Sequence, residues 1–191
     1  MKKKILVFIS KKIAQLYWGY LKKEIDSFVI NAKIQRLKFY GSNVIFKAGA
    51  VIYYPENLSI GNHVRVGDDC FIMAIGGIEI GDGTIISRNV CIHSGNHNYK
   101  TAEMTPYDKT YDKRKINIGK AVWIGQNVNI LPGVTIGDGA IIGMGTTVSK
   151  DIGVGEIVVG NGQRSLGTRN LDDLKEAISE ESYFSKKYPN S

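Results

Sequence analysis

The chain has 191 residues, of which 43% are hydrophobic and 23% are charged. This length is enough for one buried core and excludes a large multidomain protein. The composition is that of a folded globular chain rather than a disordered or membrane-embedded one. Its 22 glycines against 4 prolines predict frequent tight turns, because glycine enters positive φ without a steric penalty.

The formal net charge of +7 is unevenly distributed along the chain. Residues 1–38 contain ten Lys or Arg and two acidic residues, whereas residues 39–191 contain 15 basic and 16 acidic residues. This excess at one end argues against a nucleic-acid groove across the body. It favours an anionic lipid surface, a helical partner or a solvated helix face. The two cysteines, Cys70 and Cys91, indicate neither a disulfide framework nor a metal pair, so a reducing compartment is expected.

Residues 1–38 predict a basic amphipathic helical segment. At 100° per residue, one side carries Ile5, Ile9, Ile13, Leu16, Tyr17 and Tyr20, and the other carries Lys11, Gln15 and Lys22. The apolar run is too short for a signal peptide or a spanning helix, so a cytoplasmic chain is expected. We favour packing of this segment over the open end of the hydrophobic core, because the apolar residues at that end must be covered whether or not the helix also binds a membrane. Peripheral contact with the inner face of a membrane is left open.

A strict six-residue period begins in the second half of the chain. β-Branched aliphatic residues recur at Ile118, Ile124, Ile130, Ile136, Ile142, Val148 and Val154. Small or β-branched residues stand four positions after each, at Val122, Val128, Val134, Ala140, Thr146, Ile152 and Val158. A period of six fits neither a helix nor a continuing strand, so each hexapeptide is predicted to be a short strand and a turn. Three strands per coil then build an all-β solenoid over residues 39–160.

The same series of inward-facing residues can be traced back through residues 40–92, with three intervals longer than six residues. Two residues are inserted after Ile52 and after Ile72, and twenty after Ile92. These starting points lie twenty residues apart, one coil each, so all three insertions are expected at one corner of a triangular prism. The third is an extended loop, residues 93–117, and loops of that length in compact domains are commonly functional.

Residues 161–191 are expected to form a C-terminal tail. A short helix is predicted at 170–180, with Asn170 as its N-cap, and the last residues, 186–191, are expected to be frayed.

The repeat, the histidine-bearing loop and the segments VWIG (122–125), GDGAIIGMGTTVSKDI (137–152) and VVGNGQR (158–164) together resemble the left-handed β-helix acyltransferases. The similarity covers about residues 58–166 and is greatest to galactoside, maltose, colanic-acid and capsular-polysaccharide O-acetyltransferases. It implies a left-handed parallel β-helix and a homotrimer with each active site between neighbouring prisms. It also implies acetyl transfer from acetyl-CoA to a hydroxyl of a saccharide, such as a building block of a cell-surface polysaccharide.

The resemblance places the general base on His97, within SGNHNY (94–99), where the family has a histidine that accepts the proton of the acceptor hydroxyl. The chemistry agrees, because an imidazole with an ordinary pKa of about 6.5 can take a proton at neutral pH. His93 is the rival base, but it follows inward Ile92 and should point outward from the prism wall. The family has Asp or Pro after its histidine where this chain has Asn98, so the group that orients the ring is left open.

The resemblance also implies a coenzyme A site. Trp123 corresponds to a wall of the pantetheine tunnel, and Met144, Ser149 and Lys150 correspond to coenzyme A contacts. Arg164 matches a basic residue near the phosphates, and Lys150 and Arg164 carry the charge that a phosphorylated nucleotide needs.

Two residues are candidates for contact with the acceptor. Asp69 lies near the acceptor-contacting region of the family, although a solvated turn acid is the simpler interpretation. Tyr99 is an aromatic residue of the extended loop.

Two other functions are considered. One is a zinc enzyme of the gamma carbonic anhydrase type, which binds zinc through three histidines shared across a trimer interface; the chain has His63, His93 and His97. The other is a scaffold without catalytic activity. The cysteines suit no covalent mechanism, because Cys70 occupies an inward position and Cys91 lacks an activating base. Direct acetyl transfer without a metal is therefore expected.

Overall fold

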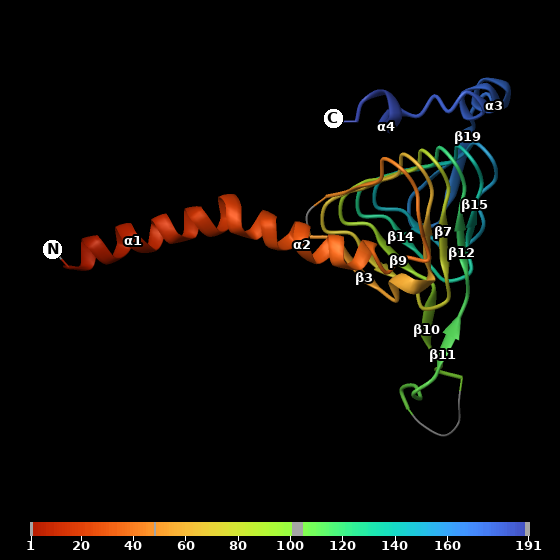
Figure 1. Ribbon diagram of the computed structural model, residues 1–191. Coiled ribbons are helices and arrows are strands. Elements are labelled where there is room, and N and C mark those ends of the chain that lie inside the picture. The colour runs from red at the N-terminus through yellow and green to blue at the C-terminus, as the bar shows by residue number, and fades with distance from the viewer. Residues whose placement is uncertain (1, 48, 101–104, 190–191) are drawn as a thin grey trace.

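The computed structural model describes residues 2–47, 49–100 and 105–189, and its body is a parallel β-solenoid with three flat faces (Figure 1). Face 1 contains β1 (Phe39–Tyr40), β4 (Leu58–Ile60), β7 (Ile78–Ile80), β12 (Ile116–Ile118) and β15 (Thr135–Ile136). Face 2 contains β2 (Ile45–Phe46), β5 (Arg65–Val66), β8 (Ile85–Ile86), β13 (Trp123–Ile124), β16 (Ile141–Ile142), β18 (Glu156–Val159) and β19 (Arg164–Thr168). Face 3 contains β3 (Val51–Tyr53), β6 (Phe71–Met73), β9 (Cys91–His93), β14 (Asn129–Ile130) and β17 (Thr147–Val148). The all-β solenoid expected from the period is confirmed.

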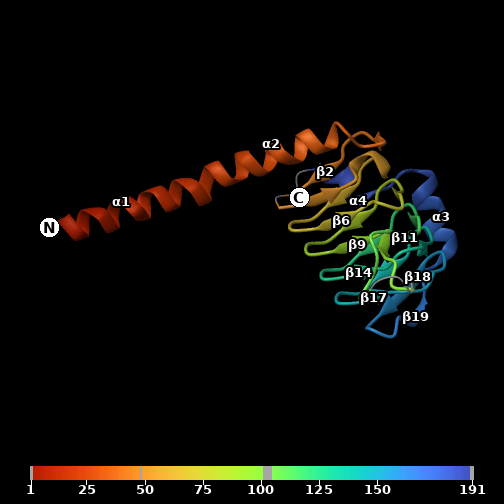
Figure 2. The same ribbon diagram turned by 90° about the horizontal axis from the view of Figure 1, so that it is seen from below.

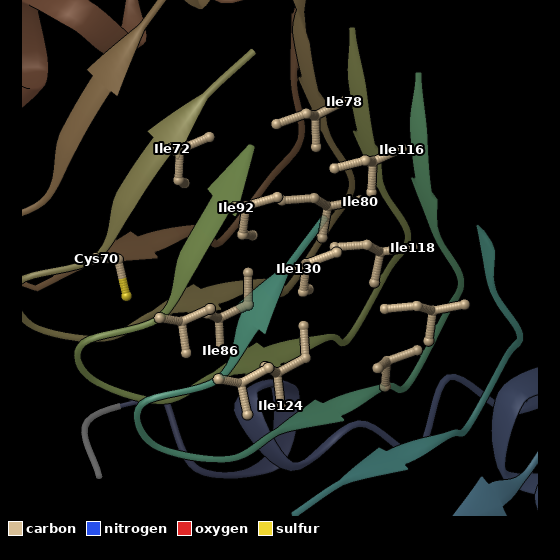
Figure 3. Packing of buried hydrophobic residues seen from close by; sticks show 14 of the residues in the cluster. Cys70, Ile72, Ile78, Ile80, Ile86, Ile92, Ile116, Ile118, Ile124 and Ile130 are labelled. Carbon is tan, nitrogen blue, oxygen red and sulfur yellow. The ribbon is translucent and has the colours of Figure 1, made fainter. Parts of the chain in front are cut away.

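The core is a set of aliphatic ladders that run along the axis of the prism. Figure 3 shows isoleucines from all three faces pointing toward one another, and Ile72, Ile78, Ile92 and Ile124 are 0% exposed. Each coil pairs in register with the next, as β6 does with β9 through Ile72 opposite Ile92. A single coil cannot enclose its own apolar face, so stacking of the coils is what removes these side chains from water.

The expected register fails in the last coil. Val154 was expected inside but is 53% exposed, whereas Ile152 is 3% exposed and bridges to Ile136 of face 1. Strand pairing joins Ile142 directly to Val158, so this coil is two residues shorter than the one before it. The Asp151 carboxylate accepts a hydrogen bond from the Thr135 backbone N–H at 2.7 Å, in the place of a ladder bond, and holds the shortened turn.

The corners between faces require left-handed backbone conformations. At the corner between faces 2 and 3, φ is positive at Gly49, Asp69, Asn89, Asn127 and Gly145; at the corner between faces 1 and 2, it is positive at Asn43, His63, Gly83, Ala121, Gly139 and Gly155. Glycine and asparagine dominate both rows, because these residues tolerate that region best. Many of the glycines are thus explained by corner geometry.

All three insertions leave the corner between faces 3 and 1, as expected. The first contains the short 3-10 helix η2 (Pro55–Asn57), between β3 and β4, and the second lies between β6 and β7. The third is not an irregular loop throughout. Its two ends form an antiparallel ribbon of β10 (Gly95–His97) and β11 (Tyr111–Lys113), which projects from the prism (Figure 1).

The N-terminal segment is one long helix made of α1 (Lys2–Leu16), the π-helical turn η1 (Tyr17–Leu21) and α2 (Lys22–Ile34). It packs on the prism only through its last turns: Ile30 is 9% exposed, and Ile34 and Leu37 contact the core in part. The remainder extends away from the body (Figures 1 and 2). The favoured packing of the whole segment over the open core is therefore wrong for this chain taken alone.

The C-terminal tail runs back along the corner between faces 1 and 2. The predicted helix is confirmed as α3 (Leu171–Ser179), with the Asn170 side chain accepting bonds from the N–H groups of Asp172 and Asp173. Leu174 packs over Gly139, and the Tyr183 ring packs over Gly83; at both glycines a Cβ would overlap the packed side chain.

The expected fraying of residues 186–191 is wrong for Lys186 and Lys187, which are helical, and residues 190–191 lie outside the described residues. A second helix, α4 (Phe184–Lys187), follows α3, and Tyr183 and Ser185 are 4% and 2% exposed. The Ser185 hydroxyl donates to the backbone carbonyl of His63, and Arg65 donates to the carbonyl of Tyr188. Within the described residues, no helix combines the length and the apolar character needed to cross a bilayer.

Candidate active site

The antiparallel ribbon is fixed to the prism at its base. Ser94, directly after β9, is 0% exposed; its hydroxyl donates to the carbonyl of Met73 and accepts from the N–H of Gly76, both at 2.9 Å. The Ser94 carbonyl accepts a bond from Arg114 at 2.8 Å on the returning strand. The first end of the ribbon is thus tied to the previous coil through Ser94, and the returning end is tied to Ser94 itself, so the first residues of the ribbon have a defined position.

His97 is the last residue of β10 and lies opposite Tyr111 in the ribbon. Its ring stacks on Tyr107 with centroids 3.9 Å apart and planes at 18°, and lies 4.7 Å from the Tyr111 ring. The Nδ1 atom is buried and has no hydrogen-bond partner among the described residues, while the residue as a whole is half-buried. Nε2 is therefore the ring nitrogen that can meet a hydroxyl group.

Asn98 closes the ribbon behind the histidine. Its N–H donates to the carbonyl of Thr110 and its carbonyl accepts from the N–H of Asp108, both at 3.1 Å. Its side-chain amide reaches the Asp108 carboxylate and the Thr110 hydroxyl, each at 3.3 Å. Hydrogen bonds from Thr110 hold the pKa of Asp108 below its usual range. Two tyrosine rings and this network, rather than an adjacent carboxylate, hold the His97 ring, and residue patterns alone did not indicate the tyrosines.

Trp123 and Met144 line one groove on the outer side of face 2. Both are exposed, at 55% and 70%, although both are apolar. The groove has a volume of about 350 Å³ and is lined by Ser87, Trp123, Gly125, Gln126, Ile141, Ile142, Gly143 and Met144. The structure thus brings together two of the expected coenzyme A contacts.

Ser149, Lys150 and Arg164 gather at the C-terminal end of the prism through a residue that sequence reasoning missed. The Gln163 side-chain oxygen accepts bonds from the N–H groups of Ser149 and Lys150, at 3.0 and 2.9 Å. Its amide nitrogen donates to the Lys150 carbonyl at 2.7 Å. Lys150 and Arg164 are exposed and form no ion pair within the described part of the chain. Gln163, which directly precedes Arg164, therefore links the backbone of Lys150 to this end of the prism.

The expected site residues do not all lie at one place in a single chain. His97 and Tyr99, which is 66% exposed, belong to the corner between faces 3 and 1. The Trp123–Met144 groove lies on face 2. Asp69 is at the corner between faces 2 and 3, with φ of 56° and an ion pair of 3.5 Å to Arg88. Face 3 separates the histidine ribbon from the groove.

The other two histidines have structural surroundings. His93 points outward on face 3 and stacks on Phe71 with centroids 5.2 Å apart; burial lowers its pKa. His63 is 9% exposed at the opposite corner, covered by Tyr183 and Ser185. Within the described residues, no three metal-ligating side chains cluster.

Neither cysteine is suited to act as a nucleophile. Burial raises the pKa of Cys70 to about 11, and its thiol lies 3.1 Å from the carbonyl of Ser87. Burial also raises the pKa of Cys91. Both side chains are therefore thiols rather than thiolates at neutral pH.

A solenoid of six-residue repeats, with a ribbon that carries a histidine at one corner, defines the class of hexapeptide-repeat transferases, and comparisons with known proteins agree. The model of the bacterial transferase hexapeptide (six repeats) matches residues 115–150, and that of the hexapeptide repeat of succinyl-transferase matches residues 57–94. The chain belongs to the hexapeptide-repeat transferase family.

Individual relatives are acetyltransferases by name. The chain is 32% identical over 121 residues to the putative colanic acid biosynthesis acetyltransferase WcaF of Escherichia coli K12, which covers 63% of the chain and 64% of that relative. Among solved structures, a maltose O-acetyltransferase from Clostridium difficile 630 is 30% identical with a TM-score of 0.66, covering 73% of this chain and 74% of that one. A hexapeptide-repeat acetyltransferase of Vibrio cholerae, solved with acetyl-CoA, is 22% identical with a TM-score of 0.68 over 80% of this chain and 85% of that one, and shares the fold.

Proposed function

We propose that this chain transfers an acetyl group from acetyl-CoA to a hydroxyl of a saccharide, with His97 as general base. The observation that carries the proposal is the His97 ring, which is stacked on Tyr107 at the end of β10 with its Nδ1 atom buried, leaving Nε2 as the nitrogen to meet the acceptor. The names of the relatives, which include colanic-acid and maltose acetyltransferases, support the acyl group and the class of acceptor.

In the proposed reaction, Nε2 of His97 takes the proton of the acceptor hydroxyl as its oxygen attacks the thioester carbonyl carbon. The tetrahedral adduct then expels the coenzyme A thiolate as the carbon–sulfur bond breaks, and the imidazolium returns the proton to sulfur. Such a base contributes about 10²–10⁴-fold to the rate. No covalent enzyme intermediate is needed, in keeping with the raised pKa of Cys70 and Cys91.

The groove on face 2 is the proposed site for the pantetheine arm of acetyl-CoA. Its apolar walls, Trp123 and Met144, fit a slender and largely apolar chain. Lys150 and Arg164, beside the Ser149 turn that Gln163 holds, offer positive charge for the phosphates. The donor set therefore fits the cosubstrate.

A homotrimer, the assembly that the resemblance implies, is part of the proposal, and the same geometry supports an assembly of more than one copy. In one chain the base and the groove lie on opposite sides of face 3, so a reaction between their ligands requires a second copy. If the ribbon of one copy faces the groove of the next, His97 and Trp123 border one cleft. Tyr99 of the ribbon would then approach the acceptor, and Asp69, on the groove side of face 3, would approach from the other copy.

The zinc alternative gains little support from these positions. A shared zinc site would need each histidine at a subunit surface, but His63 is covered by the C-terminal tail of its own chain. A silent scaffold would not need an imidazole that packs against two tyrosine rings.

The test combines ligand binding with acetyl transfer. Acetyl-CoA should raise the Tm of the purified chain, because it binds the native state alone. In a screen of saccharide acceptors with thiol detection of released coenzyme A, His97→Ala should lower kcat by about 100-fold or more while the acetyl-CoA shift in Tm remains. His93→Ala is the matched control and should keep most activity. Full activity of His97→Ala would show that the assigned base is wrong.

A further inference from the structure

The N-terminal helix presents a continuous apolar stripe that no other described part of the chain covers. Its expected members are all exposed, including Ile9 at 49%, Ile13 at 62% and Tyr20 at 61%. The helix is about 50 Å long at about 1.5 Å per residue. Single exposed apolar residues are common on protein surfaces, but a contiguous stripe of this length indicates an interaction surface.

The π-helical turn extends this stripe beyond the point where the sequence pattern ends. A π turn takes one residue more than an α turn, which rotates all later positions by about 100°. Without that residue, Ile25 and Phe28 would fall outside the stripe; with η1 at Tyr17–Leu21 they align with Ile9 and Ile13. Ile25 and Phe28 are 54% and 76% exposed.

The stripe faces away from the prism. Phe28 and Ile30 are two positions apart and lie on nearly opposite sides of α2. Ile30 packs on the first coil, whereas Phe28 points to solvent. The helix also projects beyond the body in both views (Figures 1 and 2), so a flat surface can contact the stripe without meeting the prism.

The charge of the helix indicates what kind of surface contacts the apolar stripe. The first 23 residues contain seven lysines (Lys2, Lys3, Lys4, Lys11, Lys12, Lys22, Lys23) and no acidic residue. Lys22 pairs with Asp26 at 2.6 Å, but no acidic residue precedes Glu24 to offset the other lysines, and this excess of positive charge disfavours a bundle of several copies of the helix. An anionic lipid surface attracts the lysines and receives the apolar stripe, with Tyr17, Trp18 and Tyr20 suited to the headgroup region.

We propose that residues 2–28 lie in the interface of an anionic bilayer and hold the β-solenoid beside it. The helix lies in the surface rather than spanning it, since no described helix meets the length and apolarity of a spanning segment. This inference does not depend on the acetyltransferase activity.

The experiment is sedimentation of the full chain with vesicles, without acetyl-CoA or acceptor. Binding is expected to vesicles of phosphatidylcholine with 30% phosphatidylglycerol, with loss of most binding on pure phosphatidylcholine and in high salt. The variant Ile9→Glu/Ile13→Glu should bind about tenfold more weakly or worse, because the stripe loses apolar contact and gains repelled charge. Val154→Glu, which charges an exposed aliphatic residue of the prism, is the matched control and should bind like the wild type.

Molar mass in solution is measured on the same samples. Vesicle binding that the double variant retains would overturn the proposal. So would a wild-type chain that ignores anionic vesicles, together with a double variant of lower molar mass, since the stripe would then be shown to pack against other copies.

Discussion

The coils and the ribbon of this solenoid are built by different rules. In the coils, aliphatic side chains such as Ile78 are 0% exposed, and each strand repeats the contacts of the strand before it. In the ribbon, both strands are mainly half-buried or exposed, and side-chain hydrogen bonds around Asn98 and stacked rings around His97 take the place of a core. Stability is therefore expected to reside in the coils and chemistry in the ribbon, which the coils position.

The largest expected effect is on stability, in the coils. Ile78→Ala removes a buried side chain of β7 and leaves a cavity, so the free energy of unfolding should fall by about 2–5 kcal/mol. Denaturant midpoints measure this, with Val154→Ala as the control at an exposed position, where the change should stay within about 0.5 kcal/mol. Equal losses in the two variants would mean that Ile78 is not part of a tight ladder.

The next effect is on activity, in the ribbon. Tyr107→Ala removes the ring stacked 3.9 Å from His97, so kcat should drop by about three- to tenfold while Tm stays constant. Tyr107→Phe keeps the ring and should restore kcat. The pH profile of kcat separates positioning of the base from a purely structural role. A change confined to the KM for acetyl-CoA would contradict the assignment of Tyr107 as a positioning residue.

A smaller effect is expected where the end of the coils meets the proposed cosubstrate. Gln163→Met keeps the size of the side chain but removes its bonds to the Ser149 and Lys150 N–H groups. The turn should loosen and the KM for acetyl-CoA should rise by about three- to fivefold with little change in kcat. Steady-state kinetics with both substrates checks this, and an unchanged KM would separate Gln163 from the coenzyme A site.

The smallest effect concerns acid stability. Burial lowers the folded-state pKa of His93 below its ordinary value of about 6.5. Above a pH of about 6.5 the ring is neutral in both states, so its burial carries no penalty from charge. As the pH falls from about 6.5 through the folded pKa, the unfolded chain binds a proton more readily, and the free energy of unfolding decreases. His93→Phe keeps the stack on Phe71 and should lessen the drop in Tm between pH 7 and pH 5 by about 1–2 °C. If the Tm of the wild type and of His93→Phe fell equally between pH 7 and pH 5, His93 would be more exposed to solvent than the structure shows.

Much of the solenoid could be predicted from sequence because period six is a local signal that repeats. The prediction that Val154 is buried was wrong, because the last coil is shorter and the Asp151 carboxylate replaces a backbone hydrogen bond of the ladder there. His97 could be named from its motif, but Tyr107 could not, since nine residues lie between the two in the sequence. Gln163 was missed for a similar reason, because its partners lie in the preceding coil.

The sequence by itself determined the repeat, the common corner of the three insertions and the basic amphipathic start, because each depends on residues at fixed spacing. Only the tertiary structure decided that the helix leaves the body, that a π turn prolongs its apolar stripe and that the tail covers His63. It also separated the histidine ribbon from the Trp123 groove by a whole face. The covering of His63 and the separation of ribbon and groove depend on contacts between distant segments, which leave no periodic pattern in the chain. The direction of the helix and its π turn are backbone geometry that the spacing of residues does not specify.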